Sequence, residues 1–128
     1  MSKRVRLRVP LPPSVNHIYR IVRAGGKLRL ALTPEARRWK NSVALAIAAN
    51  RDYFPFDVGE SSHWFALRVW YYFPDRRRRD THNCLKLLCD AVASGLGVDD
   101  RWILVREEGV EVDPDRPRLE IEVERVVK

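Results

Sequence analysis

The stretch WFALRVWYYFPDRRRRDTHNCLKLLCDAVASGLGVDDRWILV, residues 64–105, decides the fold because it contains the patterns of a strand, a helix and a second strand in succession. Its first ten residues place an apolar side chain at every second position: Phe65, Leu67, Val69, Tyr71 and Phe73. The positions between them are also apolar except Arg68, so residues 64–73 predict a central strand. The sequence leaves open whether a helix or a partner subunit covers this second face.

A helical period follows in residues 82–94. Apolar side chains recur at i, i+3, i+4 and i+7 and predict the buried face of this helix: Leu85, Leu88, Cys89 and Val92. Gly95 and Gly97 are expected to end the helix, since glycine is favoured just beyond a helix end. A separate polar stripe contains Asn83, Lys86 and Asp90.

The N-terminal half supplies another strand and another helix. Residues 4–9 alternate apolar side chains with arginines, as a half-buried strand does, and residues 10–19 contain three prolines and predict a fixed loop. Thr33-Pro34 is the pattern of a helix start. Apolar side chains then follow at helical spacing through residues 34–50: Ala36, Trp39, Val43 and Ile47.

Turns and two final strands complete the expected fold. Gly25-Gly26 marks a turn with a possible short strand over residues 27–31, and residues 52–62 predict a loop. Residues 103–112 and 118–126 predict the last strands, joined by the turn Asp113-Pro114-Asp115. The order β-α-β-α-β-β predicts one α+β domain over residues 1–128, with the helices packed on a mixed sheet.

The composition indicates a globular protein with an anionic partner. The 128 residues suffice for one hydrophobic core, and 45% hydrophobic with 32% charged residues argues against disorder. The 24 Lys and Arg exceed the 17 Asp and Glu by 7, and nineteen of these cations are Arg, which grips phosphate by two-point contacts. Nucleic acid is the commonest such partner, although ribosomal proteins and antitoxins share this charge.

The cysteines and the start of the chain bear on its compartment. Cys84 and Cys89 lie five positions apart in one expected helix and support no disulfide framework. There is no apolar run of membrane length, and the first residues carry no signal-peptide pattern. We therefore expect a cytoplasmic protein.

Four consecutive arginines, Arg76, Arg77, Arg78 and Arg79, run into Asp80 at the expected start of the second helix. Such a run is usually a solvated surface. Here it lies where a strand ends and a helix begins, a position that favours anion binding. The arginines are therefore candidates for holding phosphates.

A set of oxygen donors accompanies the arginines. The turn at Gly97 is expected to bring Asp99 and Asp100 back toward the helix, near Asp80 and Lys86. Carboxylates of this kind hold Mg²⁺, which activates water and neutralises the charge that grows on a reacting phosphate. A positioned lysine adds fixed positive charge at the same oxygens. This donor set predicts metal-dependent phosphodiester hydrolysis.

Two separated motifs resemble those of the RusA-type Holliday junction resolvases. One is Arg77-Arg78-Arg79-Asp80-x-His82-Asn83-x-x-Lys86-x-x-x-Asp90-Ala91 followed by Gly97-x-Asp99-Asp100, and the other is Pro12-Pro13-Ser14-x-Asn16-x-x-Tyr19-Arg20. The resemblance extends from Val9 to about Glu124. It implies a small α+β homodimer that uses Mg²⁺ to nick four-way DNA junctions in symmetric pairs, in DNA recombination and repair.

The resemblance also implies roles for single residues. Asp80 and Asp100 match the family's catalytic, metal-binding carboxylates, and Lys86 matches its catalytic lysine. Residues expected to contact DNA are Asn16, Arg20, Arg76, Arg77, Arg78, Arg79 and Asn83.

One position departs from the family pattern. His82 stands where the family has a carboxylate, and imidazole suits Mn²⁺ or softer metals better than Mg²⁺. His82 is either a metal ligand or outer-sphere group, or only a helix-start residue. Asp99 is an alternative source of the missing carboxylate, so the expected metal set is Asp80, His82, Asp99 and Asp100.

Other residues have simpler interpretations. A zinc site at His82, Cys84 and Cys89 matches no common spacing, and His17 and His63 are expected at the surface. Three tryptophans, Trp39, Trp64 and Trp70, are expected in the core, and Trp102 is ambiguous. Asp90 either pairs within its helix or contacts the active site.

Three functional hypotheses follow. The first is a junction-resolving endonuclease, for which a C₂ homodimer would supply the two sites that a two-fold junction needs. The second is a nucleic-acid-binding protein that has lost catalysis, with His82 as the trace of that loss. The third is a metal nuclease for flaps or ordinary duplex.

Overall fold

The long strand β4, Phe65–Phe73, lies inside a four-stranded mixed sheet of order β1-β6-β4-β5 in this computed structural model. The strands β1, Arg4–Val9, and β6, Arg118–Arg125, pair antiparallel, as do β6 and β4. The strand β5, Ile103–Val112, pairs parallel to β4. The structure describes residues 4–13, 18–50, 64–77, 79 and 81–126, and the expected loop at 52–62 lies outside them.

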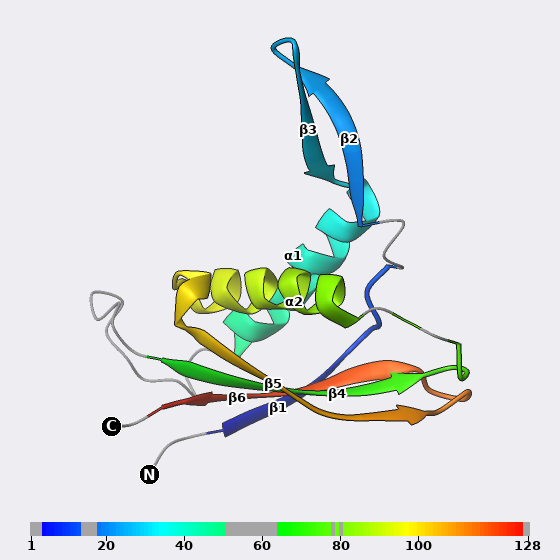
Figure 1. Cartoon of the computed structure of the whole chain (residues 1–128). Coiled ribbons are helices and arrows are strands. Elements are labelled where there is room, and N and C mark those ends of the chain that lie inside the picture. The colour runs from blue at the N-terminus through cyan, green and yellow to red at the C-terminus, as the bar shows by residue number, and fades with distance from the viewer. Residues whose placement is uncertain (1–3, 14–17, 51–63, 78, 80, 127–128) are drawn as a thin grey trace.

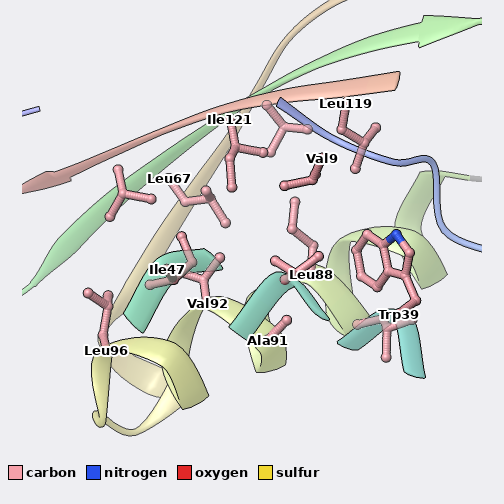
Figure 2. Packing of buried hydrophobic residues seen from close by; sticks show 14 of the residues in the cluster. Val9, Trp39, Ile47, Leu67, Leu88, Ala91, Val92, Leu96, Leu119 and Ile121 are labelled. Atoms are coloured by element: carbon pink, nitrogen blue, oxygen red, sulfur yellow. The ribbon is translucent and has the colours of Figure 1, made fainter. Parts of the chain in front are cut away.

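Two helices cover one face of this sheet (Figure 1). The helix α1 spans Pro34–Ala49, and α2 spans Thr81–Leu96 between the parallel strands β4 and β5. Their apolar faces meet the inner side chains of the strands, as Figure 2 shows for Leu67 and Ile121 above Ile47 and Val92. The predicted α+β class, with helices on one mixed sheet, is confirmed.

The start of α1 is formed as the sequence predicts. The Thr33 hydroxyl accepts a hydrogen bond from the backbone N–H of Ala36 at 3.2 Å, and Pro34 takes the first helical position. All four predicted core positions of this helix are buried: Ala36, Trp39, Val43 and Ile47. The indole of Trp39 donates to the carbonyl of Pro10 at 2.8 Å, which ties the proline-rich loop to the helix.

The predicted end of α2 is wrong at Gly95. The helix continues through Gly95 to Leu96, and only Gly97 adopts a positive φ, +75°, beyond its end. Gly95 instead lies against α1: a β-carbon there would stand 2.6 Å from the Ala44 carbonyl oxygen and 2.6 Å from Cβ of Ile47. This glycine is required by the close approach of two helices rather than by a turn.

The sheet face opposite the helices carries charged side chains over aromatic ones. Arg6 lies over Trp70, 4.2 Å from the ring centroid, and Arg118 lies over Tyr72 at 3.9 Å. Glutamates of β6 pair with these arginines and with Arg68. Trp70 is thus half-buried under a cation and is not part of the core, which corrects the prediction for that residue.

A hairpin missing from the expected order projects from the rest of the fold (Figure 1). It consists of β2, Tyr19–Ala24, and β3, Lys27–Leu32, joined by Gly25 and Gly26, which both have positive φ. The short strand expected over residues 27–31 is therefore confirmed, but β2 was not predicted. In the described part of the chain, no helix is long and apolar enough to span a membrane.

Candidate active site

The turn after α2 brings the acidic pair back along the helix. The backbone N–H groups of Gly97 and Val98 both donate to the Ala93 carbonyl, at 2.9 and 3.0 Å, so the chain reverses within a few residues. The short helix η3, Asp100–Trp102, follows and leads into β5. The expected return of the two aspartates toward α2 is thus seen.

Asp100 meets Asp90 of α2. The side chain of Asp100 interacts with that of Asp90, and Lys86 and Lys40 bring positive charge to Asp90 from one helix each. Burial raises the pKa of Asp90, the contact with Asp100 raises it further, and the two lysines oppose this shift. The structure therefore gathers two carboxylates and two lysines, and we call these four residues the Asp90–Asp100 cluster.

Asp99 has both Arg101 and Asp100 as partners. Its carboxylate caps η3 by accepting the backbone N–H of Arg101 at 3.0 Å and pairs with the Arg101 guanidinium at 3.2 Å. These bonds from Arg101, together with the contact with Asp100, hold the pKa of Asp99 below its ordinary value. Asp99 is therefore engaged with Arg101 in the local turn, and Asp100 is the member of the pair that also contacts Asp90.

One face of α2 runs from its first turn to the cluster. His82, Lys86 and Asp90 follow each other at intervals of four, so they lie on the same side of the helix. His82 and Lys86 are exposed, and Asp90 is half-buried. At the same end as His82, the Thr81 hydroxyl donates to Glu107 of β5 at 3.0 Å and anchors the helix start to the sheet. The Asn83 side chain lies outside the described residues.

The arginine run divides into two kinds of residue. Arg76 and Arg77 are exposed, as a phosphate-binding role requires. Arg79 is held at 2.7 Å by Asp75 and stacks on Phe73 with 4.6 Å to the ring centroid. The backbone N–H of Arg77 and the side chain of Arg79 hold the pKa of Asp75 below its usual range. Arg79 thus fixes the turn after β4.

Several predicted site residues cannot be placed relative to this cluster. Asp80, Arg78 and Asn16 lie outside the described residues. Arg20 is exposed in β2 of the projecting hairpin. Asp90 lies nine positions after Thr81, roughly 14 Å along the axis, so the arginine run precedes the start of α2 and the Asp90–Asp100 cluster lies near the middle of the helix.

Comparison with known proteins identifies the family of this chain. The model of the family described as Endodeoxyribonuclease RusA matches residues 10–124, which include β4, α2 and the acidic turn. The chain belongs to this family. The predicted resemblance and the endodeoxyribonuclease class are confirmed by that match.

A curated relative agrees with the family assignment. The crossover junction endodeoxyribonuclease rusA of Enterobacteria phage 82 is 30% identical over 99 residues, which cover 77% of this chain and 75% of the relative. Among solved structures, a 2C-methyl-D-erythritol 2,4-cyclodiphosphate synthase from Plasmodium vivax aligns with a TM-score of 0.38 and 7% identity, over 99% of this chain and 96% of that one. Likeness at that level supports neither a shared fold nor a shared function.

The donor set of this RusA-family chain fits a hard divalent cation. The half-buried Asp90 and the exposed Asp100 are in contact, and two neighbouring carboxylates favour a cation between them because each raises the cost of ionising the other. Asp80 is not among the residues that the structure describes. Among those residues, no three His, Cys, Asp or Glu side chains lie close enough together to form a complete metal site. Asp90 and Asp100 are therefore candidate ligands only.

Cys89 lies half-buried beside the cluster. Burial, with the charges of Asp90 and Asp100, raises the pKa of its thiol to about 11. At neutral pH the free group is therefore a thiol and not a reactive thiolate. Cys84 and Cys89 are both free of disulfide bonds, which agrees with the expected absence of a disulfide framework.

Nothing in the sequence indicated that Lys40 belongs to the cluster. For Asp90, the sequence left open whether it pairs within its helix or contacts the active site. Asp90 had a signal, since it shares a helix face with Lys86. Lys40 had none, because its approach depends on how α1 crosses α2 and not on any local spacing.

Proposed function

We propose that this chain is a metal-dependent endodeoxyribonuclease that resolves four-way DNA junctions by paired symmetric nicking. The observation that carries the proposal is the Asp90–Asp100 cluster on α2 and η3 in a chain of the RusA family. The phage 82 relative is described as a crossover junction endodeoxyribonuclease, which favours the same substrate. We also propose that the chain acts in DNA recombination and repair, in the cytoplasm.

Mg²⁺ is the proposed metal, with Mn²⁺ as the alternative. Asp100 and Asp80 are the proposed ligands, and the contact of Asp90 with Asp100 adds Asp90 to this set. Asp99 is the weaker candidate because Arg101 occupies its carboxylate. When bound, the metal supplies Lewis acidity at the phosphate and a water of lowered pKa. His82, exposed on the same helix face, is suited to an outer-sphere contact or to ligating Mn²⁺.

The chain's own residues bind and orient the DNA. Lys86, exposed one helical turn from Asp90, holds fixed positive charge where charge develops on the phosphate oxygens. Arg76 and Arg77, with Arg78, Asn16, Arg20 and Asn83, are the proposed contacts to flanking phosphates. Arg79 positions this loop through Asp75 and Phe73.

Paired nicking requires two sites, so the proposed active form is a homodimer. A chain of this size contributes one cluster, and a two-fold axis would present two clusters to the two matching strands of a junction. Coordinated cuts on opposite strands follow from this symmetry.

A labelled four-way junction, incubated with the purified protein and Mg²⁺ or Mn²⁺, tests the proposal. We expect symmetric nicks in opposite strands, faster than any cut in linear duplex or a flap of the same sequence. Junction binding without cleavage in either metal would indicate a protein that has lost catalysis. Preferential cutting of linear duplex or flaps would indicate a nuclease of another specificity.

A further inference from the structure

The β2–β3 hairpin carries positive charge on one face, which we call the basic face. Side chains alternate between the two faces along each strand, and residues that pair across the strands share a face. This register places Arg20, Lys27 and Arg29 on the same side of the ribbon, and all three side chains are exposed. Residues 19–32 contain no acidic residue that could neutralise this charge. The basic face is therefore suited to an anionic partner.

The opposite side of the hairpin, which we call the apolar face, is exposed to solvent. At the base of the ribbon, Leu32 packs against the hydrophobic core. Further along, the apolar face continues with Ile21, Leu28 and Leu30, which are 70%, 68% and 72% exposed. Arg23 pairs with Leu28 and adds a charge near the tip. Neighbouring aliphatic side chains that are this exposed are typical of a surface that binds a ligand.

The hairpin projects from the side of the large sheet that the two helices cover, which is also the side of the Asp90–Asp100 cluster (Figure 1). Its base is fixed to the start of α1 by a hydrogen bond from the Thr33 N–H to the carbonyl of Ile18, at 2.9 Å. Lys40 of the cluster follows Thr33 by seven positions, roughly 10 Å along α1. Each strand of the ribbon has six residues and is therefore roughly 20 Å long. A DNA duplex held at the cluster would reach the hairpin as well.

Branched DNA offers a matching surface to each face of the ribbon. Its phosphates match the basic face, and a two-stranded ribbon fits the major groove of a DNA arm. In continuous duplex, stacking covers the flat faces of the base pairs. At a branch point this stacking is interrupted, so aliphatic side chains can contact a base-pair face without the cost of unstacking a step. A protein partner with an apolar surface would leave the basic face unmatched.

We propose that the β2–β3 hairpin is the element of this chain that recognises the branch point of the junction. The ribbon lies between two arms: its basic face contacts the phosphates of one arm, and its apolar face packs against the base pair that the branch leaves unstacked. The apolar contact exists only at a branch and selects a junction over linear duplex, whereas the basic face holds both kinds of DNA. The inference rests on the proposed function, because it names the part of the chain that selects the substrate of that nuclease.

Binding of the full-length protein to labelled DNA, without divalent metal, tests the apolar face. We expect the unaltered chain to bind a four-way junction more tightly than linear duplex of the same sequence. Leu30→Ser should weaken junction binding about tenfold and duplex binding less than about twofold, because only the branch offers a base-pair face to this side chain. Ile21→Ser, on the same face, should act alike. Leu45→Ser is the matched control and should change neither affinity, since Leu45 of α1 is 71% exposed and lies outside the hairpin.

Arg29→Ala tests the basic face in the same binding assay. It should weaken junction and duplex binding by a similar factor, and it should reduce the slope of log affinity against log salt concentration by about 1, because one phosphate contact is lost. Arg8→Ala is the matched control. Arg8 is exposed on β1, on the sheet face opposite the helices, so its removal should leave that slope unchanged.

The fluorescence of 2-aminopurine, placed at the branch point, reports the apolar contact directly because its emission depends on base stacking. At saturating protein, the unaltered chain and Arg29→Ala should both change the emission. Leu30→Ser should not, because it lacks the side chain that packs against the unstacked base pair.

Two results would overturn the inference. One is an equal loss of junction and duplex affinity in Leu30→Ser. The other is unchanged junction affinity in both Leu30→Ser and Ile21→Ser, which would assign the apolar face to a protein partner instead. Because binding is measured without metal, an unaltered chain that binds junctions but does not cut them with Mg²⁺ or Mn²⁺ removes only the nuclease assignment. A chain that cuts junctions while Leu30→Ser and Ile21→Ser bind them normally removes only this inference.

Discussion

Glu120 shows how a single buried carboxylate is maintained on this basic chain. It accepts hydrogen bonds from Arg118 at 2.8 Å and from Arg6 at 3.1 Å, and those two arginines lie over Tyr72 and Trp70. Burial raises the pKa of Glu120, but the bonds and charges of the two arginines more than offset this, so the pKa lies below its ordinary value. The ionised form therefore stabilises the fold.

Glu120→Gln should lower the free energy of unfolding at neutral pH by about 1 kcal/mol, since two charge-assisted hydrogen bonds lose their anion. A group whose folded pKa is depressed contributes stability above its unfolded pKa, about 4.3, and loses it as the pH falls through the folded value. The difference between variant and unaltered protein, measured by urea denaturation from pH 7 to pH 3, should therefore shrink below pH 4. A difference in the free energy of unfolding that stays constant from pH 7 to pH 3 would contradict the stabilising role of the ionised Glu120 carboxylate.

Single residues also mark the limits of prediction from sequence. Thr33, Pro34 and Gly97 act locally, and their roles followed from their neighbours alone. The partners of Glu120 did not follow, because they lie on strands that are far apart in the chain. For the same reason, the contacts of Asp90 with Asp100 and with Lys40 could not be predicted from the sequence.

At the scale of elements, the crossing of α1 and α2 depends on Gly95. The elements with a clear period were predicted well, since the strand over residues 103–112 and the start of α1 agree with the structure. The strand β2 was missed because the proline-rich loop was extended through Tyr19. Its signal was the Gly25-Gly26 pair between two apolar-basic runs, a pattern typical of a two-residue hairpin turn.

Gly95→Ala should destabilise the protein by about 1–3 kcal/mol, because the new methyl group meets the Ala44 carbonyl oxygen and Ile47 at 2.6 Å and the helices must separate. Ser94→Ala is the control at the next position, where the side chain is exposed and alanine is a better helix former. Urea denaturation of both variants measures the effect. If Gly95→Ala matched or exceeded the stability of the unaltered chain, the close crossing would be wrong.

At the scale of the whole molecule, one sheet and two helices bring the acidic turn to the middle of α2. The parallel connection from β4 through α2 to β5 determines this, because it returns the chain along the helix after Gly97. The family and the fold class were predictable from two motifs and the order of elements. Which aspartate of the pair faces the helix was not, because both fit the spacing equally well.

The direct test compares Asp100→Asn with Asp99→Asn in cleavage of a labelled four-way junction with Mg²⁺. Asparagine replaces Asp99 as a helix cap with little loss, so that variant should cut at close to the unaltered rate. Asp100→Asn should cut more than about a hundredfold more slowly while binding the junction at least as tightly, since it removes a metal ligand and a negative charge from a phosphate site. Equal rates for the two variants, or loss of junction binding together with cleavage in Asp100→Asn, would contradict the account.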